Sequence, residues 1–274
     1  MRLKVLLAAA AIAVAAPATA DHHANPAMEA ALAMDNRKDD RARDEWRHPA
    51  ETLKFFRVKP GMIVVDFMPS SGWYTRVLVP YLGEKGRYIS LNPYSANIAD
   101  ERTKTFFSQL APRFEERYPT WNLKGAPVSS VVSDAIPADM LGTADRVLIF
   151  REMHNLHRLG LVPYELGKVR ALLKDGGMLG IVQHRAKPWA SGDYTNGSKA
   201  YLRQQDVIGL VEAHGFELVG TSEVNANPKD PADWPAGSWM LPPGYRDAPE
   251  GSEQRAKVDA VGESDRMTLL FRKR

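Results

Sequence analysis

Short apolar runs, most of them rich in β-branched residues, recur along the chain from residue 62 onward. Runs of four to eight such residues, bounded by Gly, Pro or Asp, are typical of strands that are buried on both faces. The pattern predicts strands at 62–67, 87–91, 128–132, 145–150, 178–184, 216–219 and 267–272.

Between these runs, apolar residues three and four positions apart indicate helices. The spacing predicts helices at 26–34, 52–56, 75–82, 95–117, 164–173 and 203–214. Pro80 is expected to kink or end the third of them, because a proline inside a helix removes a backbone hydrogen bond. Residues 225–262 are rich in Pro, Gly, Asp and Trp, which predicts a long irregular loop.

Strands that alternate with helices predict an α/β fold, a Rossmann-like and mostly parallel sheet of seven strands with helices on both faces. The last two strands have no clear crossover helix between them, so they are expected to form an antiparallel pair. Ligands bind such sheets outside the carboxyl ends of the strands. We therefore expect the chemistry to lie in the loops after residues 67, 91, 132, 150 and 183.

The first 20 residues have the pattern of a secretory signal peptide, with a retained membrane anchor as the alternative. Arg2 and Lys4 precede an apolar run at 5–16, and Ala-Thr-Ala at 18–20 is a small-residue cleavage site. The sequence thus predicts export, to the periplasm in a bacterium. It also predicts a charged, helical extension at 21–50 and one domain at 51–274.

Composition narrows the classes of function further. The formal net charge is +3. Removal of Arg2 and Lys4 with the signal peptide lowers it to +1, so charge gives no argument for nucleic acid binding. The chain has no cysteine, which excludes disulfides, thiolate metal sites and a cysteine nucleophile. No other stretch approaches 18 apolar residues, so no membrane span is expected after cleavage. The pattern does not determine the oligomeric state.

Several loop motifs together resemble one family of proteins. They are VKPG at 58–61, DFMPSSGWYT at 66–75, REMHNL at 151–156, QHR at 183–185 and SDRMTLLFR at 264–272. On these motifs, residues 35–274 resemble the class I S-adenosylmethionine-dependent methyltransferases, and more narrowly the predicted methyltransferases of bacteria that carry export signals. The resemblance implies a methyltransferase fold, S-adenosylmethionine as cofactor and a small-molecule acceptor.

The resemblance also implies a set of cofactor-binding positions, which here are Asp66, Met68, Ser70, Gly72, Asn92 and Asp134. The family's loop usually reads Gly-x-Gly-x-Gly, so Met68 and Ser70 replace two glycines. Asn92 stands where an acidic residue usually holds the ribose hydroxyls, and Asp134 matches the acidic residue near adenine. An ordinary strand–helix turn without a ligand is the alternative for residues 70–72.

A dinucleotide-binding site would use the same architecture. Its fingerprint begins with a glycine directly after the first strand, and Asp66 stands at that position. The Gly-x-Gly-x-x-Gly motif is absent as well. We therefore do not expect a nicotinamide cofactor.

Two histidines follow strand ends and are the candidate catalytic residues. His154 follows the fourth strand and His184 ends the fifth. A neutral imidazole can accept a proton near neutral pH, so His154 is a candidate base or orienting group. Together with His157 the pair could also form a three-histidine metal site, but no acidic ligand accompanies them and we predict no metal.

Arg151 and Arg185 follow the same two strands and could clamp an anionic substrate, with surface ion pairs as the alternative. Tyr74 is a further candidate for substrate binding. Three aromatic residues lie in the predicted loop and could form a lid or hold the loop on the sheet, namely Trp234, Trp239 and Tyr245.

Cleavage after residue 20 would create a terminus that begins Asp21-His22-His23. A free amine with histidine in third place can bind Cu(II) or Ni(II) in a square-planar set, with a solvated tail as the alternative.

Two functions remain open from the sequence. One is a methyltransferase that acts on an unknown small molecule. The other is a non-catalytic periplasmic binding protein that has a methyltransferase fold and a repurposed pocket.

Overall fold

The computed structural model describes residues 25–274. The predicted signal peptide and the Asp21–His23 terminus lie outside the described residues. A sheet with the strand order β3-β2-β1-β4-β5-β8-β7 forms the centre of the molecule. Its strands are β1 Ile63–Phe67, β2 Arg87–Asn92, β3 Val128–Val132, β4 Ala144–Phe150, β5 Leu173–Ala186, β7 Phe216–Ser222 and β8 Arg266–Lys273.

The first five strands of the sheet run parallel, and β8 lies antiparallel between β5 and β7. A short strand, β6 Leu202–Arg203, pairs with the end of β5. The chain passes from β1 to β2 and β3 on one side and then returns to β4 on the other side of β1. The predicted mostly parallel sheet and its antiparallel C-terminal pair are thus confirmed, and the order of strands reverses between β1 and β4.

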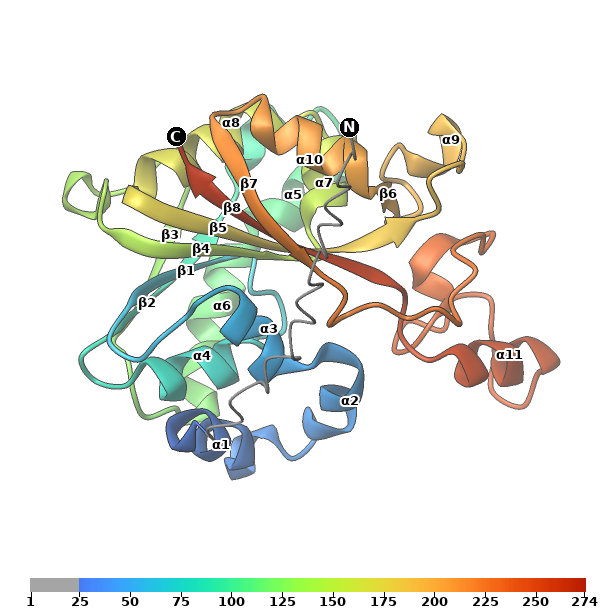
Figure 1. Cartoon of the computed structure of the whole chain (residues 1–274), viewed down its shortest axis with the longest axis horizontal. Coiled ribbons are helices and arrows are strands. Elements are labelled where there is room, and N and C mark those ends of the chain that lie inside the picture. Colours follow the sequence, from blue (N-terminus) through green and yellow to red (C-terminus); the bar gives the residue numbers. More distant parts are fainter. Residues whose placement is uncertain (1–24) are drawn as a thin grey trace, which may run out of the picture.

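Helices cover both faces of this sheet (Figure 1). One face packs against α5 Glu101–Ser108, α7 Met153–Arg158, α8 Val162–Leu172 and α10 Gln204–Glu212. The other packs against α1 Pro26–Ala33, α3 Pro49–Phe55, α4 Thr75–Leu82 and α6 Leu110–Arg117. The remaining α-helices are α2 Asp44–Arg47, α9 Gly192–Thr195 and α11 Glu253–Val261. Pro80 lies inside α4, which ends two residues later.

The prediction of one helix at 95–117 is wrong. The segment forms the 3₁₀ turn η3 Ser95–Asn97 and then the two helices α5 and α6. Asp100 starts α5 because its side chain accepts a hydrogen bond from the N–H of Thr103. Pro112 has no N–H to continue the ladder, so the helix is interrupted between residues 108 and 110.

The prediction of an irregular loop at 225–262 is wrong in part, because the segment contains η6 Gly237–Met240 and α11. Ser252 caps α11, and Gly262 ends it at a φ of 82°. Val258 is the buried residue of this helix, so its sequence shows little amphipathic pattern. The segment has a small core of its own, which includes Trp234, Met240 and Leu241.

Residues 25–50 pack against the domain. Met28 and Ala31 of α1 belong to the same apolar core as Leu78 of α4. Arg37 and Arg47 are almost fully buried, and both guanidinium groups stack on the ring of Trp73.

In the part of the chain that the structure describes, no helix combines the length and the apolar character that a membrane crossing requires.

Candidate functional site

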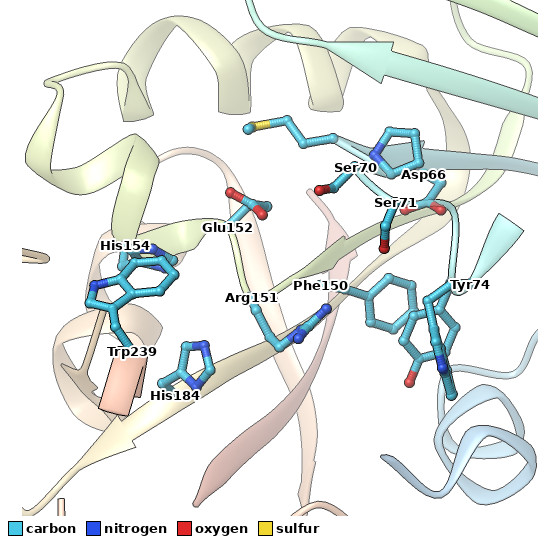
Figure 2. A pocket seen from close by; sticks show the side chains of 13 residues that line it. Asp66, Ser70, Ser71, Tyr74, Phe150, Arg151, Glu152, His154, His184 and Trp239 are labelled. Carbon is cyan, nitrogen blue, oxygen red and sulfur yellow. The ribbon is translucent and has the colours of Figure 1, made fainter. Parts of the chain in front are cut away.

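A cavity of about 200 Å³ opens at the carboxyl ends of β1 and β4, where the strand order reverses. The loop after β1, the loop after β4, the end of β5 and the turn η6 supply its walls (Figure 2). Its lining residues are Asp66, Met68, Pro69, Ser70, Ser71, Trp73, Tyr74, Phe150, Arg151, Glu152, His154, His184 and Trp239. We call this the switch-point cavity.

The loop after β1 keeps a backbone that glycine favours, although two glycines are replaced. Met68 and Ser70 both have a φ of 52°, and Gly72 has a φ of 75°. A left-handed conformation costs a residue with a side chain about 1–2 kcal/mol, and such strain is concentrated at functional sites. The N–H of Met68 bonds to the carbonyl of Leu91, which ties this strained loop to β2.

Gly72 is needed for packing within the protein. A Cβ atom at this position would lie 2.1 Å from the ring of Trp121, which belongs to the turn η4 Tyr118–Trp121. Arg76 in turn lies over the same ring, 5.0 Å from its centre. Gly72 does not line the switch-point cavity, and its contact with a cofactor stays a prediction.

Two carboxyl groups reach the cavity, and burial raises the pKa of both. The Asp66 side chain is buried and accepts a hydrogen bond from the Tyr88 hydroxyl at 2.8 Å. Burial raises its pKa to about 7, against the opposing effect of this hydrogen bond. Glu152 also has a pKa of about 7 because of burial, although Asn155 donates to its Oε2. Both groups therefore exchange protons near neutral pH.

The two predicted histidines come together, with ring centres 6.0 Å apart. His154 is 1% exposed, and burial lowers its pKa to about 4. Burial also lowers the pKa of His184 well below its usual value, and the ring nitrogen Nδ1 lies 2.5 Å from Ser264 Oγ. Both imidazoles are therefore neutral at pH 7.

His157 does not join them, because it is exposed and lines a different cavity beside α10. Between residues 25 and 274, no three side chains of His, Cys, Asp or Glu meet in an arrangement that could hold a metal ion.

Arg151 lies in the loop after β4 with a φ of 65°, and its N–H bonds to the carbonyl of Val182. Its side chain extends into the switch-point cavity (Figure 2). Within residues 25–274, its guanidinium has no hydrogen bond and no ion pair.

A buried cluster of charge supports this side of the site. Arg43, Arg47 and Arg266 all pair with Glu263, at 2.6, 3.3 and 3.0 Å. Burial alone would raise the pKa of Glu263, but the guanidiniums, led by Arg266, lower it to about 2. We call these four residues the Glu263 cluster.

Aromatic rings form much of the cavity wall. Tyr74 stacks on Phe150 with ring centres 3.5 Å apart and an angle of 7° between the planes. Burial raises the pKa of Tyr74 to about 12, so its hydroxyl stays protonated. Trp239 covers His154, with ring centres 5.6 Å apart (Figure 2).

The three aromatic residues of the 225–262 segment therefore differ in role. Trp239 lines the switch-point cavity, as a lid would. Trp234 is buried in the small core of the segment and donates to Asp230. Tyr245 packs against the guanidinium of Arg255, so these two hold the segment in place.

Besides Gly72, three predicted site residues do not reach the switch-point cavity. Asn92 is buried and donates from Nδ2 to Ser90 Oγ at 3.1 Å. Asp134 is exposed. Arg185 pairs with Glu223 and Asp265 and lines a separate cavity, so only Arg151 of the predicted clamp lies in the site.

Glu165 of α8 occupies the space between the ends of β2 and β3. Its Oε1 accepts hydrogen bonds from Ser133 Oγ and from the N–H of Tyr94. Burial raises its pKa to about 7. Ser133 directly precedes Asp134, and Tyr94 lies two residues after Asn92. The Glu165 carboxyl group therefore occupies hydrogen-bonding groups close in sequence to both of these predicted residues.

Five lining residues are absent from the predicted site, namely Pro69, Ser71, Trp73, Phe150 and Glu152. Glu152 lies in the REMHNL motif directly after β4. Its position just after the end of a central strand could have identified it as a candidate site residue. A second cavity of about 680 Å³ adjoins the first, and the two share Met68, Ser70, Glu152 and Trp239. We call it the adjoining cavity.

Comparisons with known proteins support the fold. No protein-family model matches the sequence, and no curated protein matches it. Among solved structures, the chain is similar to a SAM-dependent methyltransferase from Aquifex aeolicus, with a TM-score of 0.51, 21% identity, and coverage of 70% of this chain and 94% of the other. It is similar to a protein assigned as a sarcosine dimethylglycine methyltransferase from Galdieria sulphuraria, with a TM-score of 0.53, 14% identity and 86% coverage of each.

A third similar structure is the [4+2]-cyclase SpnF, with a TM-score of 0.50, 14% identity, and coverage of 88% of this chain and 84% of the other. These likenesses show that the chain has the class I methyltransferase fold. Because one of the three is described as a cyclase, the fold alone does not determine the reaction.

Proposed function

We propose that the protein is an S-adenosylmethionine-dependent methyltransferase that acts on a small molecule and is exported to the periplasm. The observation that carries the proposal is the strained loop after β1, where Met68 and Ser70 keep a left-handed backbone beside a cavity at the switch point. The class I methyltransferase fold supports the same function.

The residues at this loop fit the amino-acid end of the cofactor. That end carries an ammonium, a sulfonium and a carboxylate. Asp66 and Glu152 suit the two positive groups. The backbone N–H groups of Ser70 and Ser71 suit the carboxylate, because in the described part of the chain they have no other partner. The adjoining cavity offers room for the nucleoside end.

When bound, S-adenosylmethionine supplies an electrophilic methyl group on a sulfonium. The chain itself has to orient the acceptor and exclude water, and Tyr74, Phe150 and Trp239 provide the apolar walls for this. In the free protein Glu152 and Asp66 have pKa values of about 7, and pairing with the positive groups of the cofactor should lower both, so that they are ionised at neutral pH. His154, with a pKa of about 4, is a weaker base than the sequence suggested.

A non-catalytic periplasmic binding protein is the second candidate. Asn92 and Asp134, which the resemblance places around the nucleoside, lie outside both cavities. Such a protein would use the switch-point cavity for another ligand.

The test is calorimetry of the full chain with S-adenosylmethionine and with S-adenosylhomocysteine, which lacks the sulfonium charge. From pH 6 to pH 8, Asp66 and Glu152 ionise, so the preference for the charged ligand should rise, by roughly tenfold. Glu152→Gln should reduce this pH dependence, whereas exposed Glu84→Gln should leave it unchanged.

Absence of binding heat with either ligand at millimolar concentration would overturn the methyltransferase proposal. Binding of both ligands with equal affinity at every pH would contradict the roles of Asp66 and Glu152.

A further inference from the structure

We propose that the methyl acceptor is a small aromatic carboxylate, whose carboxylate pairs with Arg151 in the switch-point cavity. This inference deepens the proposed function and rests on it, because the ligand is a methyl acceptor only if the protein is a methyltransferase. The residues of the cavity define the binding site independently of that function.

The first observation is the guanidinium of Arg151, which has no ion pair or hydrogen bond within residues 25–274. It extends into the middle of the cavity, between His184 and Phe150 (Figure 2). The bond from its own N–H to Val182, at 2.6 Å, fixes the backbone from which the side chain projects. A guanidinium that is half buried and faces a cavity is matched by a carboxylate, which can accept two parallel hydrogen bonds.

The second observation is a group of positive charges near Arg151. In the Glu263 cluster, three guanidiniums share a single carboxylate. In the described part of the chain, Arg43 Nη2 and Arg47 Nη1 are buried without a hydrogen-bond partner. Arg151 adds a fourth positive charge, which interacts unfavourably with those of Arg43, Arg47 and Arg266. A bound anion would offset this repulsion.

The third observation is a buried polar atom of a lining residue that has no partner among residues 25–274. Nε2 of His154 has no hydrogen bond, although the residue is almost fully buried. Gln183 Nε2 donates to the carbonyl of Ala200 and lies 3.5 Å from His154 Nδ1. An N–H that faces Nδ1 favours the tautomer with the proton on Nε2. His154 then offers a second donor to a ligand that carries acceptor atoms.

The aromatic walls of the switch-point cavity indicate what kind of group carries the carboxylate of the ligand. Trp73, Tyr74, Phe150 and Trp239 present aromatic surface in a cavity of about 200 Å³. Flat rings pack well against such walls. An aromatic ring with one carboxylate therefore matches both the walls and the donors.

The test compares benzoate with benzamide, a neutral molecule of nearly the same shape, by calorimetry on the full chain. Benzoate should bind about ten to a hundred times more tightly, the range expected for a hydrogen-bonded charge pair. Equal affinities, or no binding of benzoate, would overturn the proposal.

Variants locate the binding site. Arg151→Gln should remove the preference for benzoate. Arg117→Gln, an exposed change of the same charge in α6, away from both cavities, should retain it. Arg151→Glu should bind the cation benzamidine in place of benzoate, which also shows that this variant is folded. Retention of benzoate preference in Arg151→Gln would place the anion elsewhere, for example beside Arg185, and would overturn the proposal.

A pH series adds an independent readout. The cavity contains Asp66, Glu152, Arg151, His154 and His184, and the Glu263 cluster lies behind it. Asp66 and Glu152 are protonated more fully at low pH, so benzoate should bind more tightly at pH 6 than at pH 8. Tighter binding at pH 8 would contradict the proposal.

Failure of the two proposals can be distinguished. Binding of S-adenosylhomocysteine without selectivity for benzoate would overturn the acceptor class alone. Selective benzoate binding without any affinity for either cofactor form would overturn the methyltransferase and support a binding protein for aromatic carboxylates.

Discussion

Burial controls the protonation of the individual side chains in the site. Asp66, Glu152, His154 and His184 all have pKa values shifted toward their uncharged forms, and burial is the largest cause in each. Arg151 is the charged group that remains. The site is thus a weakly charged, aromatic cavity with one unpaired guanidinium.

Asp66 makes this effect measurable as stability. Its folded pKa of about 7 lies above the value of about 3.9 expected in the unfolded chain. The folded state therefore holds the proton more tightly, and its stability falls as pH rises from about 4 to 7. Asp66→Asn can still accept from Tyr88 and carries no charge. Its free energy of unfolding in urea should exceed that of the wild type at pH 8, by roughly 2–4 kcal/mol, with a smaller difference at pH 5.

The matched control is exposed Asp139→Asn, which should show no such pH-dependent gain. A loss of stability for Asp66→Asn at pH 8 would show that the carboxylate of Asp66 is ionised and stabilising.

At the level of single residues, the sequence indicated which positions lie near the site, but it did not indicate which charged side chains form ion pairs. Positions after β1 and β4 could be predicted, because strand ends of a parallel sheet meet at one edge. The different fates of Arg151 and Arg185 could not, because Glu223 and Asp265 come from distant segments. Glu152 was missed because it stands out only through its raised pKa. Burial causes this shift, and the burial of a single glutamate cannot be predicted from its sequence motif.

Among the elements, the loop after β1 combines strain with close packing. Ser70→Gly relieves the cost of a left-handed side chain, about 1–2 kcal/mol, and loses about 0.5–1 kcal/mol of chain entropy. Its stability should therefore equal that of the wild type or exceed it by up to about 1.5 kcal/mol. Met68→Gly tests the same backbone, but it also removes a buried side chain.

Gly72→Ala gives the opposite result in the same loop. The added Cβ would meet the Trp121 ring, so a loss of at least about 2 kcal/mol is expected. Thermal unfolding of the two variants checks both expectations. Destabilisation by Ser70→Gly together with tolerance of Gly72→Ala would contradict this description of the loop.

The Glu263 cluster joins the N-terminal segment to the start of β8. Glu263 lies before β8, while Arg43 and Arg47 lie in the segment 25–50. Glu263→Gln leaves three guanidiniums, two of them buried, without their anion, which should cost about 3–5 kcal/mol in the free energy of unfolding. Glu253→Gln on the exposed side of α11 is the control and should change little. Equal stability of the two variants would show that the cluster does not hold the segment.

The elements that sequence reasoning placed best were the buried strands, since apolar runs directly report burial. It failed where one residue decides the outcome, as Pro112 does between α5 and α6. It also missed α11, whose exposed surface leaves almost no periodic signal.

Across the whole molecule, the outer segments share cores with the sheet or dock on it. Met28 of α1 belongs to the core of one sheet face, and Asp230 of the 225–262 segment accepts from Tyr201 and from the N–H of Asp265. We therefore expect one cooperative unfolding transition. Tryptophan fluorescence, which reports on all six tryptophans of the chain, should change together with the far-ultraviolet circular dichroism. A fluorescence change at lower denaturant would show that an outer segment, 25–50 or 225–262, unfolds independently.

The central claim is that the switch-point cavity and its adjoining cavity bind the cofactor. Hydrogen–deuterium exchange of the full chain with saturating S-adenosylhomocysteine tests it most directly, because it locates the ligand on the backbone. The account predicts slower exchange at residues 68–74 and 150–155, with no change at 185–206 beside the separate cavity of Arg185. Unchanged exchange at 68–74, or protection confined to 185–206, would contradict it.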